Sequence, residues 1–324
     1  YAYKMNEASS QQTVAGSLRA QFGRPYDPED IFMTNGATGA LYVTIQTIAD
    51  AGDEVIYISP PWFGYEEMIR NAGATPVGVR IDPVSFDLDL ESIAAAITPR
   101  TRLIIVNSPN NPTGKIYPPE TLRALGSLLA GASQQYGRPI YLLSDEAYRR
   151  ILFDGNQFPS PSSFYPFSFI VYTYGKTLLT PGQRLGYIAI SPEMPEREAM
   201  RNAIFTMQAN CGYAFASALL QHALADLEPL CIDMEQMQVK RDRLVEGLRE
   251  AGYEVHAPEG TFYLLPKAPL ADDIAFADQL AAEGVLVLPG TICEMPGYLR
   301  LSLTANEAMI DRALPVFQRA RARA

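Results

Sequence analysis

Short apolar runs alternate with helical patterns through the first two thirds of the chain. The apolar runs predict strands at Ile31–Thr34, Glu54–Ser59, Thr75–Val79, Arg102–Asn107, Ile140–Ser144, Phe169–Thr173 and Arg184–Ile190. Helical patterns cover Gly39–Asp50, Gly64–Ala72, Leu90–Ile97 and Pro118–Tyr136. Such alternation favours a mostly parallel, seven-stranded α/β sheet with helices on both faces. Wholly apolar strands such as Leu103–Val106 fit a sheet that is buried on both sides.

The last third of the chain follows a different pattern. A long helical pattern runs from Pro229 to Gly252, where glycine is a common C-terminal signal. Short extended segments and helices then follow at Tyr253–His256, Thr261–Leu265, Asp272–Glu283, Val285–Leu288, Tyr298–Leu303 and from Glu307 onwards. The sequence therefore predicts a large domain over 12–225 and a smaller α+β domain over 226–324, to which residues 1–11 are also assigned.

Composition narrows the class of protein. The 324 residues are 48% hydrophobic and 19% charged, which fits a folded chain with a large core. The net charge of −10 and the lack of a basic stripe argue against nucleic acid as a partner. No apolar run reaches the roughly 18 residues of a membrane span.

Cysteine and histidine are both scarce. Cys211, Cys231 and Cys293 are far apart and form no CxxC pair, which argues against a disulfide framework or a zinc site and favours the cytoplasm. With His222 and His256 as the only histidines, we expect no metal centre.

In open α/β sheets, ligands bind beyond the carboxyl ends of the strands, so the residues that follow each strand are the first candidates. Asn35-Gly36-Ala37-Thr38-Gly39 opens a helix after the first strand, where free N–H groups can bind an anion. An ordinary helix start is the alternative. Trp62 follows the second strand and is either a platform for a flat ligand or a core residue.

Polar residues also follow the fourth and fifth strands. Asn107-Ser108-Pro109-Asn110-Asn111-Pro112-Thr113-Gly114 is an unusually long turn with amides that can bind a ligand oxygen. Asp145 emerges from an apolar strand and needs a cationic or N–H partner, unless it only caps the following turn.

Lys176 stands out among the five lysines because it follows a buried strand. A desolvated lysine is nucleophilic and suits covalent chemistry with a carbonyl; a surface lysine is the alternative. A P-loop is excluded because Ile170 stands where its first glycine is needed. Arg300 lies within an apolar strand and needs an anion, for which a carboxylate is the natural partner.

Taken together, these motifs resemble the fold-type I pyridoxal-phosphate (PLP) enzymes and, among them, the class I and II aminotransferases. The resemblance extends from about Asp27 to the end of the chain, and its motifs occur in the family's order. It implies that Lys176 carries PLP, that Asp145 keeps the pyridine nitrogen protonated, and that Asn111 and Tyr148 bind the phenolic oxygen.

The resemblance also assigns the remaining residues. It implies that Trp62 stacks on the pyridine ring and that Arg300 binds the substrate carboxylate. The expected phosphate site comprises Gly36, Ala37, Thr38, Thr173 and Arg184. It further implies a homodimer with shared sites, in which a tyrosine of the neighbouring subunit reaches the phosphate; Tyr3 is the first candidate and Tyr1 the second.

The expected activity is ping-pong transfer of an amino group from an L-amino acid to a 2-keto acid. The same residues also serve PLP-dependent lyases, cyclases, oxidases and racemases, which is the alternative. A ligand-sensing transcription regulator is disfavoured by the acidic composition and the lack of a winged-helix segment. The side chain of the substrate stays open, since Arg149 and Arg150 are either a second carboxylate site or surface charges.

Overall fold

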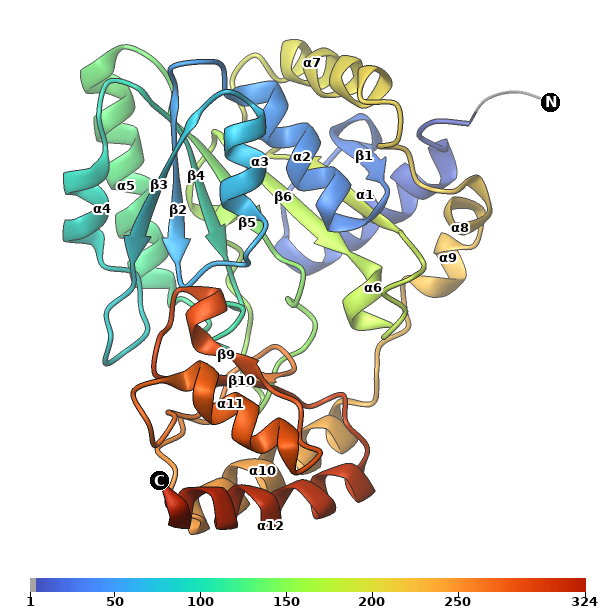
Figure 1. Cartoon of the computed structure of the whole chain (residues 1–324). Helices are drawn as coiled ribbons and strands as arrows, with labels where there is room; N and C mark the ends of the chain where they lie inside the picture. Colours follow the sequence, from blue (N-terminus) through green and yellow to red (C-terminus); the bar gives the residue numbers. More distant parts are fainter. Residues whose placement is uncertain (1–3) are drawn as a thin grey trace.

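A computed structural model describes residues 4–324, and it is organised around a seven-stranded sheet (Figure 1). Its strands are β1 (Ile31–Thr34), β2 (Glu54–Ser59), β3 (Thr75–Arg80), β4 (Thr101–Asn107), β5 (Tyr141–Asp145), β6 (Ser168–Thr173) and β7 (Gly186–Ile190). The spatial order is β1-β7-β6-β5-β4-β2-β3. Strands β3, β2, β4, β5 and β6 run parallel, and only β7 is antiparallel to its two neighbours.

Helices cover both faces of this sheet, as the sequence predicts. One face packs against α2 (Gly36–Ile48), α3 (Tyr65–Asn71) and α7 (Arg197–Asn210). The other packs against α4 (Leu90–Ala96) and α5 (Pro119–Tyr136) on one side and α1 (Ala8–Phe22) on the other. Alternate residues of β4 enter the two cores: Leu103 and Ile105 face α2, whereas Ile104 and Val106 face α5. The sheet is therefore buried on both sides.

A smaller unit lies beyond the carboxyl ends of the parallel strands (Figure 1). It combines α10 (Met234–Glu250), α11 (Asp273–Ala282) and α12 (Glu307–Arg323) with a sheet in the order β8-β10-β9. The strands of this sheet are β8 (Tyr263–Leu264), β9 (Leu288–Pro289) and β10 (Leu299–Ser302). Its core also takes in Tyr148 and Phe153, which follow β5. The two units thus meet at the strand ends.

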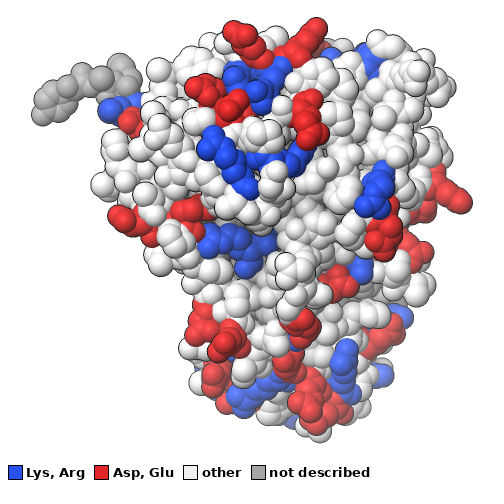
Figure 2. Space-filling model, turned by 180° about the vertical axis from the view of Figure 1, so that it is seen from behind, with Lys and Arg blue, Asp and Glu red and all other residues white. Residues whose placement is uncertain are grey.

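Short helices complete the described chain: α6 (Tyr174–Thr177), α8 (Ala218–His222), α9 (Leu224–Leu227), and the 3₁₀ turns η1 (Pro28–Asp30), η2 (Pro161–Phe164) and η3 (Gly290–Cys293). Among residues 4–324 no helix is both long and apolar enough to cross a bilayer. On the face shown in Figure 2, acidic and basic side chains are interspersed.

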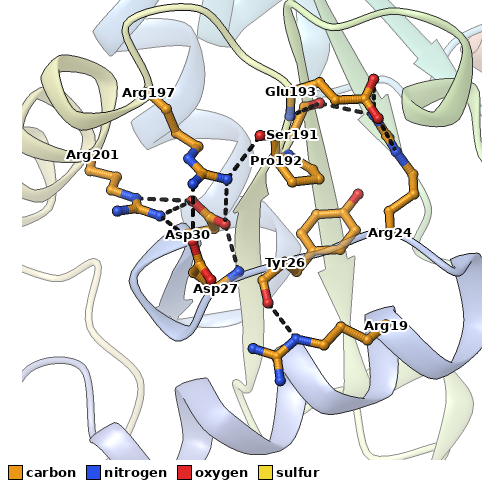
Figure 3. A network of polar contacts seen from close by, with 10 residues as sticks. All are labelled: Arg19, Arg24, Tyr26, Asp27, Asp30, Ser191, Pro192, Glu193, Arg197 and Arg201. Atoms are coloured by element: carbon orange, nitrogen blue, oxygen red, sulfur yellow. Dashed lines mark hydrogen bonds and ion pairs between the residues drawn. The ribbon is translucent and has the colours of Figure 1, made fainter.

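Helices α1 and α7 are absent from the sequence prediction, because neither carries a full apolar stripe. Only Ile204 and Gln208 of α7 are buried. Ion pairs add to the packing of this helix (Figure 3): Arg197 contacts Asp27 at 3.0 Å, and Arg201 contacts the fully buried Asp30 at 2.7 Å. Hydrophobic periodicity cannot report a helix that is held in this way.

Three predicted strands differ from the structure. The segment Tyr253–His256 is not a strand, and Val285–Leu288 contributes only its last residue to β9. Strand β7 begins at Gly186, so Arg184 lies before it. The boundary at residue 225 stays a prediction. At the N-terminus, Asn6 and Gln11 make hydrogen bonds with β1, which belongs to the large sheet.

Candidate active site

A pocket of about 590 Å³ opens at the carboxyl ends of β4, β5 and β6, beside the N-terminus of α2. Nine of the residues singled out in the sequence line it: Ala37, Thr38, Trp62, Asn111, Asp145, Tyr148, Thr173, Lys176 and Arg184. Leu41, Asn107, Ala147, Gly175 and Pro181 complete the lining. Segments up to 147 residues apart, from Ala37 to Arg184, are thus brought together.

Arg184 and the start of α2 meet at one part of the pocket lining. Arg184 donates hydrogen bonds to the Pro181 carbonyl at 2.7 Å and to the Thr38 hydroxyl at 3.4 Å, at the start of α2. Gly36 has a φ of +75°, and a Cβ there would lie 2.5 Å from Nη2 of Arg184. Glycine therefore allows the guanidinium to approach the positive end of the helix. Thr173 adds its hydroxyl from the end of β6.

Asp145 lies at the opposite side of the pocket and is 5% exposed. Its carboxylate accepts hydrogen bonds from the Tyr65 hydroxyl at 2.6 Å and from the Ala147 N–H at 3.2 Å. Burial raises the pKa of Asp145, while Tyr65, Ala147 and Lys176 oppose that rise. A protonated nitrogen of a ligand is the partner that such a carboxylate lacks. The sequence analysis did not identify Tyr65, because no pattern connects it with Asp145, which lies 80 positions further along the chain.

Lys176 lies on the short helix α6 directly after β6. The Thr173 hydroxyl accepts a hydrogen bond from the Gly175 N–H at 3.3 Å and so caps this turn. The Lys176 ammonium is 5.5 Å from the ring centroid of Tyr148 and 5.6 Å from that of Phe262. Burial raises the pKa of Tyr148 well above its ordinary value, and the neighbouring Tyr263 and Asp145 add to the effect. Tyr148 is thus a neutral hydrogen-bond donor at the working pH.

Asn111 connects the pocket to the small domain. The side chain of Asn107 accepts a hydrogen bond from the Asn111 N–H at 2.7 Å and fixes the turn. The Asn111 side chain in turn accepts a hydrogen bond from Arg300 of β10 at 3.1 Å. Arg300 therefore contacts a residue of the pocket lining across 189 positions of sequence, but it is not itself among the residues that line the pocket.

Trp62 is half-buried, and its ring meets the edge of Tyr65 with centroids 5.6 Å apart. It lines the pocket and also packs against the core of the large unit, so the structure bears out part of each interpretation. Arg149 and Arg150 do not line it. Arg149 is buried in an ion pair with Glu146 at 3.3 Å, and Arg150 bonds the carbonyls of Glu228 and Leu230, so neither forms the second carboxylate site considered above. Tyr1 and Tyr3 lie outside the described residues.

Around one cavity the structure brings together the start of α2 with Arg184, the buried carboxylate of Asp145 and the amine of Lys176. Together with the large mixed sheet and the appended small unit, they define a fold-type I transferase.

The family model for aminotransferase class I and II matches residues 8–317, and the chain belongs to this family. The aspartate/prephenate aminotransferase of Thermus thermophilus is 36% identical over 97% of this chain and 81% of its own length. The probable aspartate/prephenate aminotransferase of Thermus aquaticus is 35% identical over 95% of this chain and 80% of its own length.

Solved structures agree with this assignment. An aminotransferase from Eubacterium rectale superposes with a TM-score of 0.95 at 31% identity, covering 99% of this chain and 82% of its own. The aspartate aminotransferase of Thermus thermophilus with maleate gives a TM-score of 0.84 at 33% identity, covering 97% of this chain and 81% of its own. The chain is accordingly an aminotransferase, an enzyme that transfers nitrogenous groups, and its family implies PLP as the cofactor.

Proposed function

We propose that the pocket binds PLP through the residues named above and that the enzyme exchanges an amino group between an L-amino acid and a 2-keto acid in two half-reactions. The observation that carries the proposal is the placement of Asp145, Lys176 and the Arg184 corner around one cavity. PLP is flat and carries a basic ring nitrogen, an aldehyde and a phosphate. Asp145 complements the ring nitrogen, Lys176 the aldehyde and the Arg184 corner the phosphate.

The donor set fits this cofactor. The start of α2, Thr38, Thr173 and Arg184 hold the phosphate, and the Gly36 position leaves room for the guanidinium. The buried Asp145 keeps a proton on the ring nitrogen, since a cationic partner offsets the cost of its own burial. Asn111 and Tyr148 donate hydrogen bonds to the phenolic oxygen. Trp62 covers one face of the ring.

When bound, PLP supplies an electron-withdrawing ring that weakens the bonds at the substrate Cα. Lys176 would hold the cofactor through its side-chain amine until the amine of the substrate replaces it. Its freed amine then removes the Cα proton and returns a proton to the product, acting as general base and acid. Arg300 binds the α-carboxylate and so fixes which Cα bond faces Lys176.

Several features support a homodimer in the cytoplasm. Phe63, Leu179 and Tyr213 are 55%, 41% and 55% exposed, and Phe63 and Leu179 lie within three residues of the pocket residues Trp62 and Lys176. Contact between two subunits at this face would cover them. Cys211, Cys231 and Cys293 are all free thiols, in keeping with a reducing compartment. Light scattering of the purified protein tests the dimer.

The relatives are named for aspartate and prephenate, so aspartate, glutamate and their keto acids are the first substrates to try. The covalent part of the proposal is tested by borohydride reduction of the PLP-loaded enzyme followed by peptide mass mapping. We expect the cofactor mass on Lys176 and none on Lys115, which is paired with Glu259. A label on another lysine, or no label at all, contradicts the proposal.

A further inference from the structure

Tyr263 lies beside the pocket residue Tyr148, with ring centroids 5.9 Å apart, and the backbone that leads to it is unusually constrained. The preceding Thr261 is buried and has a φ of +69°, a left-handed conformation that β-branched residues rarely adopt. Two hydrogen bonds hold it: the Thr261 N–H donates to the Ile151 carbonyl at 3.0 Å, and the Thr261 hydroxyl accepts from the Tyr263 N–H at 3.1 Å. Strain of this kind persists where the surroundings enforce it, and it is common at functional sites.

The two aromatic residues that follow Thr261 contact different cationic side chains. Phe262 lies near Lys176, with 5.6 Å between the ammonium and the ring centroid. Tyr263 lies under Arg300, whose guanidinium carbon is 4.3 Å from the ring centroid. This is the geometry of a cation–π contact, which is strongest when the charge is partly desolvated.

Arg300 is therefore held from two directions. The ring of Tyr263 supports one face of the guanidinium, and Asn111 accepts from one edge at 3.1 Å. No carboxylate among residues 4–324 lies within ion-pair distance of Arg300. The other N–H groups of the Arg300 guanidinium are thus available to a ligand, in a plane that the Tyr263 ring fixes. A planar guanidinium suits bidentate binding of a carboxylate.

We propose that Tyr263 is a positioning residue for substrate binding: its ring holds the Arg300 guanidinium in the plane that receives the substrate α-carboxylate. The proposal rests on the function assigned to Arg300 above. The ring face carries the effect, so phenylalanine can replace tyrosine and leucine cannot.

Carboxylate binding by the PLP-loaded enzyme tests the proposal without turnover. Succinate and 3-phenylpropionate are each titrated into wild-type enzyme, with the visible absorbance of the bound cofactor as the readout. The tighter ligand and the matching compound in which every carboxylate is a primary amide, succinamide or 3-phenylpropanamide, are then compared in Tyr263→Phe, Tyr263→Leu, Arg300→Gln and the double variant of the last two. Tyr136→Leu, at the far end of α5, is the matched control for loss of an aromatic ring.

We expect Tyr263→Leu to weaken the acid about tenfold, which corresponds to about 1.4 kcal/mol, and to leave the amide within about twofold. Tyr263→Phe and Tyr136→Leu should behave as wild type. In the Arg300→Gln background the leucine substitution should have no further effect, because the ring acts only through the guanidinium.

Equal weakening of acid and amide by Tyr263→Leu would show general damage to the pocket and overturn the proposal. So would a tenfold loss that persists in the Arg300→Gln background. If Arg300→Gln leaves the acid as tightly bound as before, or wild type does not prefer the acid to the amide, the role of Arg300 itself fails, and the proposal for Tyr263 fails with it.

Discussion

The two walls of the pocket are held in different ways. The wall from the seven-stranded sheet carries Asp145, Thr173 and Lys176 on or directly after adjacent parallel strands, so the backbone ladder sets their spacing. The wall toward the small unit depends on Arg300, which donates to the lining residue Asn111, and on Tyr263, whose ring lies beside Arg300 and the lining residue Tyr148. The first wall is thus as rigid as the sheet, whereas the second depends on a few contacts across the boundary.

Substitutions in the wall from the sheet should therefore lower kcat, whereas those in the small unit should weaken substrate binding. Lys176→Ala should show the largest effect. Without the amine there is no covalent attachment and no general base, so turnover of any amino acid should fall below detection. The check is steady-state activity together with the visible absorbance of the PLP-loaded variant. A variant that still turned over would remove Lys176 from the mechanism.

Asp145→Asn should lower kcat by about 10²–10³-fold, the scale of losing one preorganised electrostatic contact. In the cofactor-free protein, by contrast, Asp145→Asn should raise the stability of the folded state. Because burial raises the pKa of Asp145, the folded state is penalised as the pH rises above the ordinary carboxyl pKa, and asparagine removes that penalty.

Thermal unfolding of the apoprotein at pH 4 and pH 8 measures this second effect. The variant should gain stability relative to wild type mainly at pH 8. Tyr65→Phe, which removes only the hydroxyl that bonds Asp145, is the matched control and should reduce kcat less. An apoprotein whose stability difference did not depend on pH would contradict the burial argument.

Arg300→Ala should mainly raise KM for amino acids, by about 2–5 kcal/mol in apparent binding free energy, because a charged partner is truncated. Arg300→Lys should recover only part of the loss, since lysine lacks the planar fork. Initial rates over a range of amino acid concentrations separate KM from kcat. An unchanged KM would remove Arg300 from the substrate site.

The smallest effect is expected at the boundary itself. Glu259 binds Lys115 at 2.7 Å and the Ile116 N–H at 2.8 Å, and so connects the small unit to the Asn107–Gly114 turn. Both side chains are partly exposed, so Glu259→Gln should cost no more than about 1 kcal/mol. The readouts are KM and thermal stability.

The matched control is Glu254→Gln, which breaks an exposed pair with Lys267 within the small unit. Only Glu259→Gln should raise KM. Equal effects of the two substitutions on KM would mean that the contacts across the boundary do not position the second wall.

The sheet wall was predictable from the sequence for a physical reason. The apolar pattern of a buried strand shows where the strand ends, and parallel strands have their carboxyl ends at the same edge of the sheet. The sequence alone therefore assigns Asp145, Asn111 and Lys176 to one site. Helix α2 was recognised for the same reason, since its glycine-rich start follows a strand directly.

The other parts of the site depend on contacts that leave no periodic signal. Tyr65 meets Asp145 only because the start of α3 enters the core that it shares with β5, and Tyr263 meets Arg300 only because the strained Thr261 turns the chain. Arg149 could be a surface charge or a ligand by sequence; in the structure it is buried against Glu146 and the ring of Tyr172. The sequence does not distinguish a charged residue that is paired within the protein from one that binds a ligand.

The central claim is that this pocket performs the first half of an amino transfer with PLP. The most direct measurement is a titration of the PLP-loaded enzyme with a panel of amino acids, beginning with aspartate, in the absence of any keto acid. We predict that the yellow band of the bound cofactor is replaced by the band of pyridoxamine phosphate, with one equivalent of keto acid released per site. Return of the yellow band with accumulation of keto acid and ammonia, or no yellow band even after PLP is added, would contradict the account.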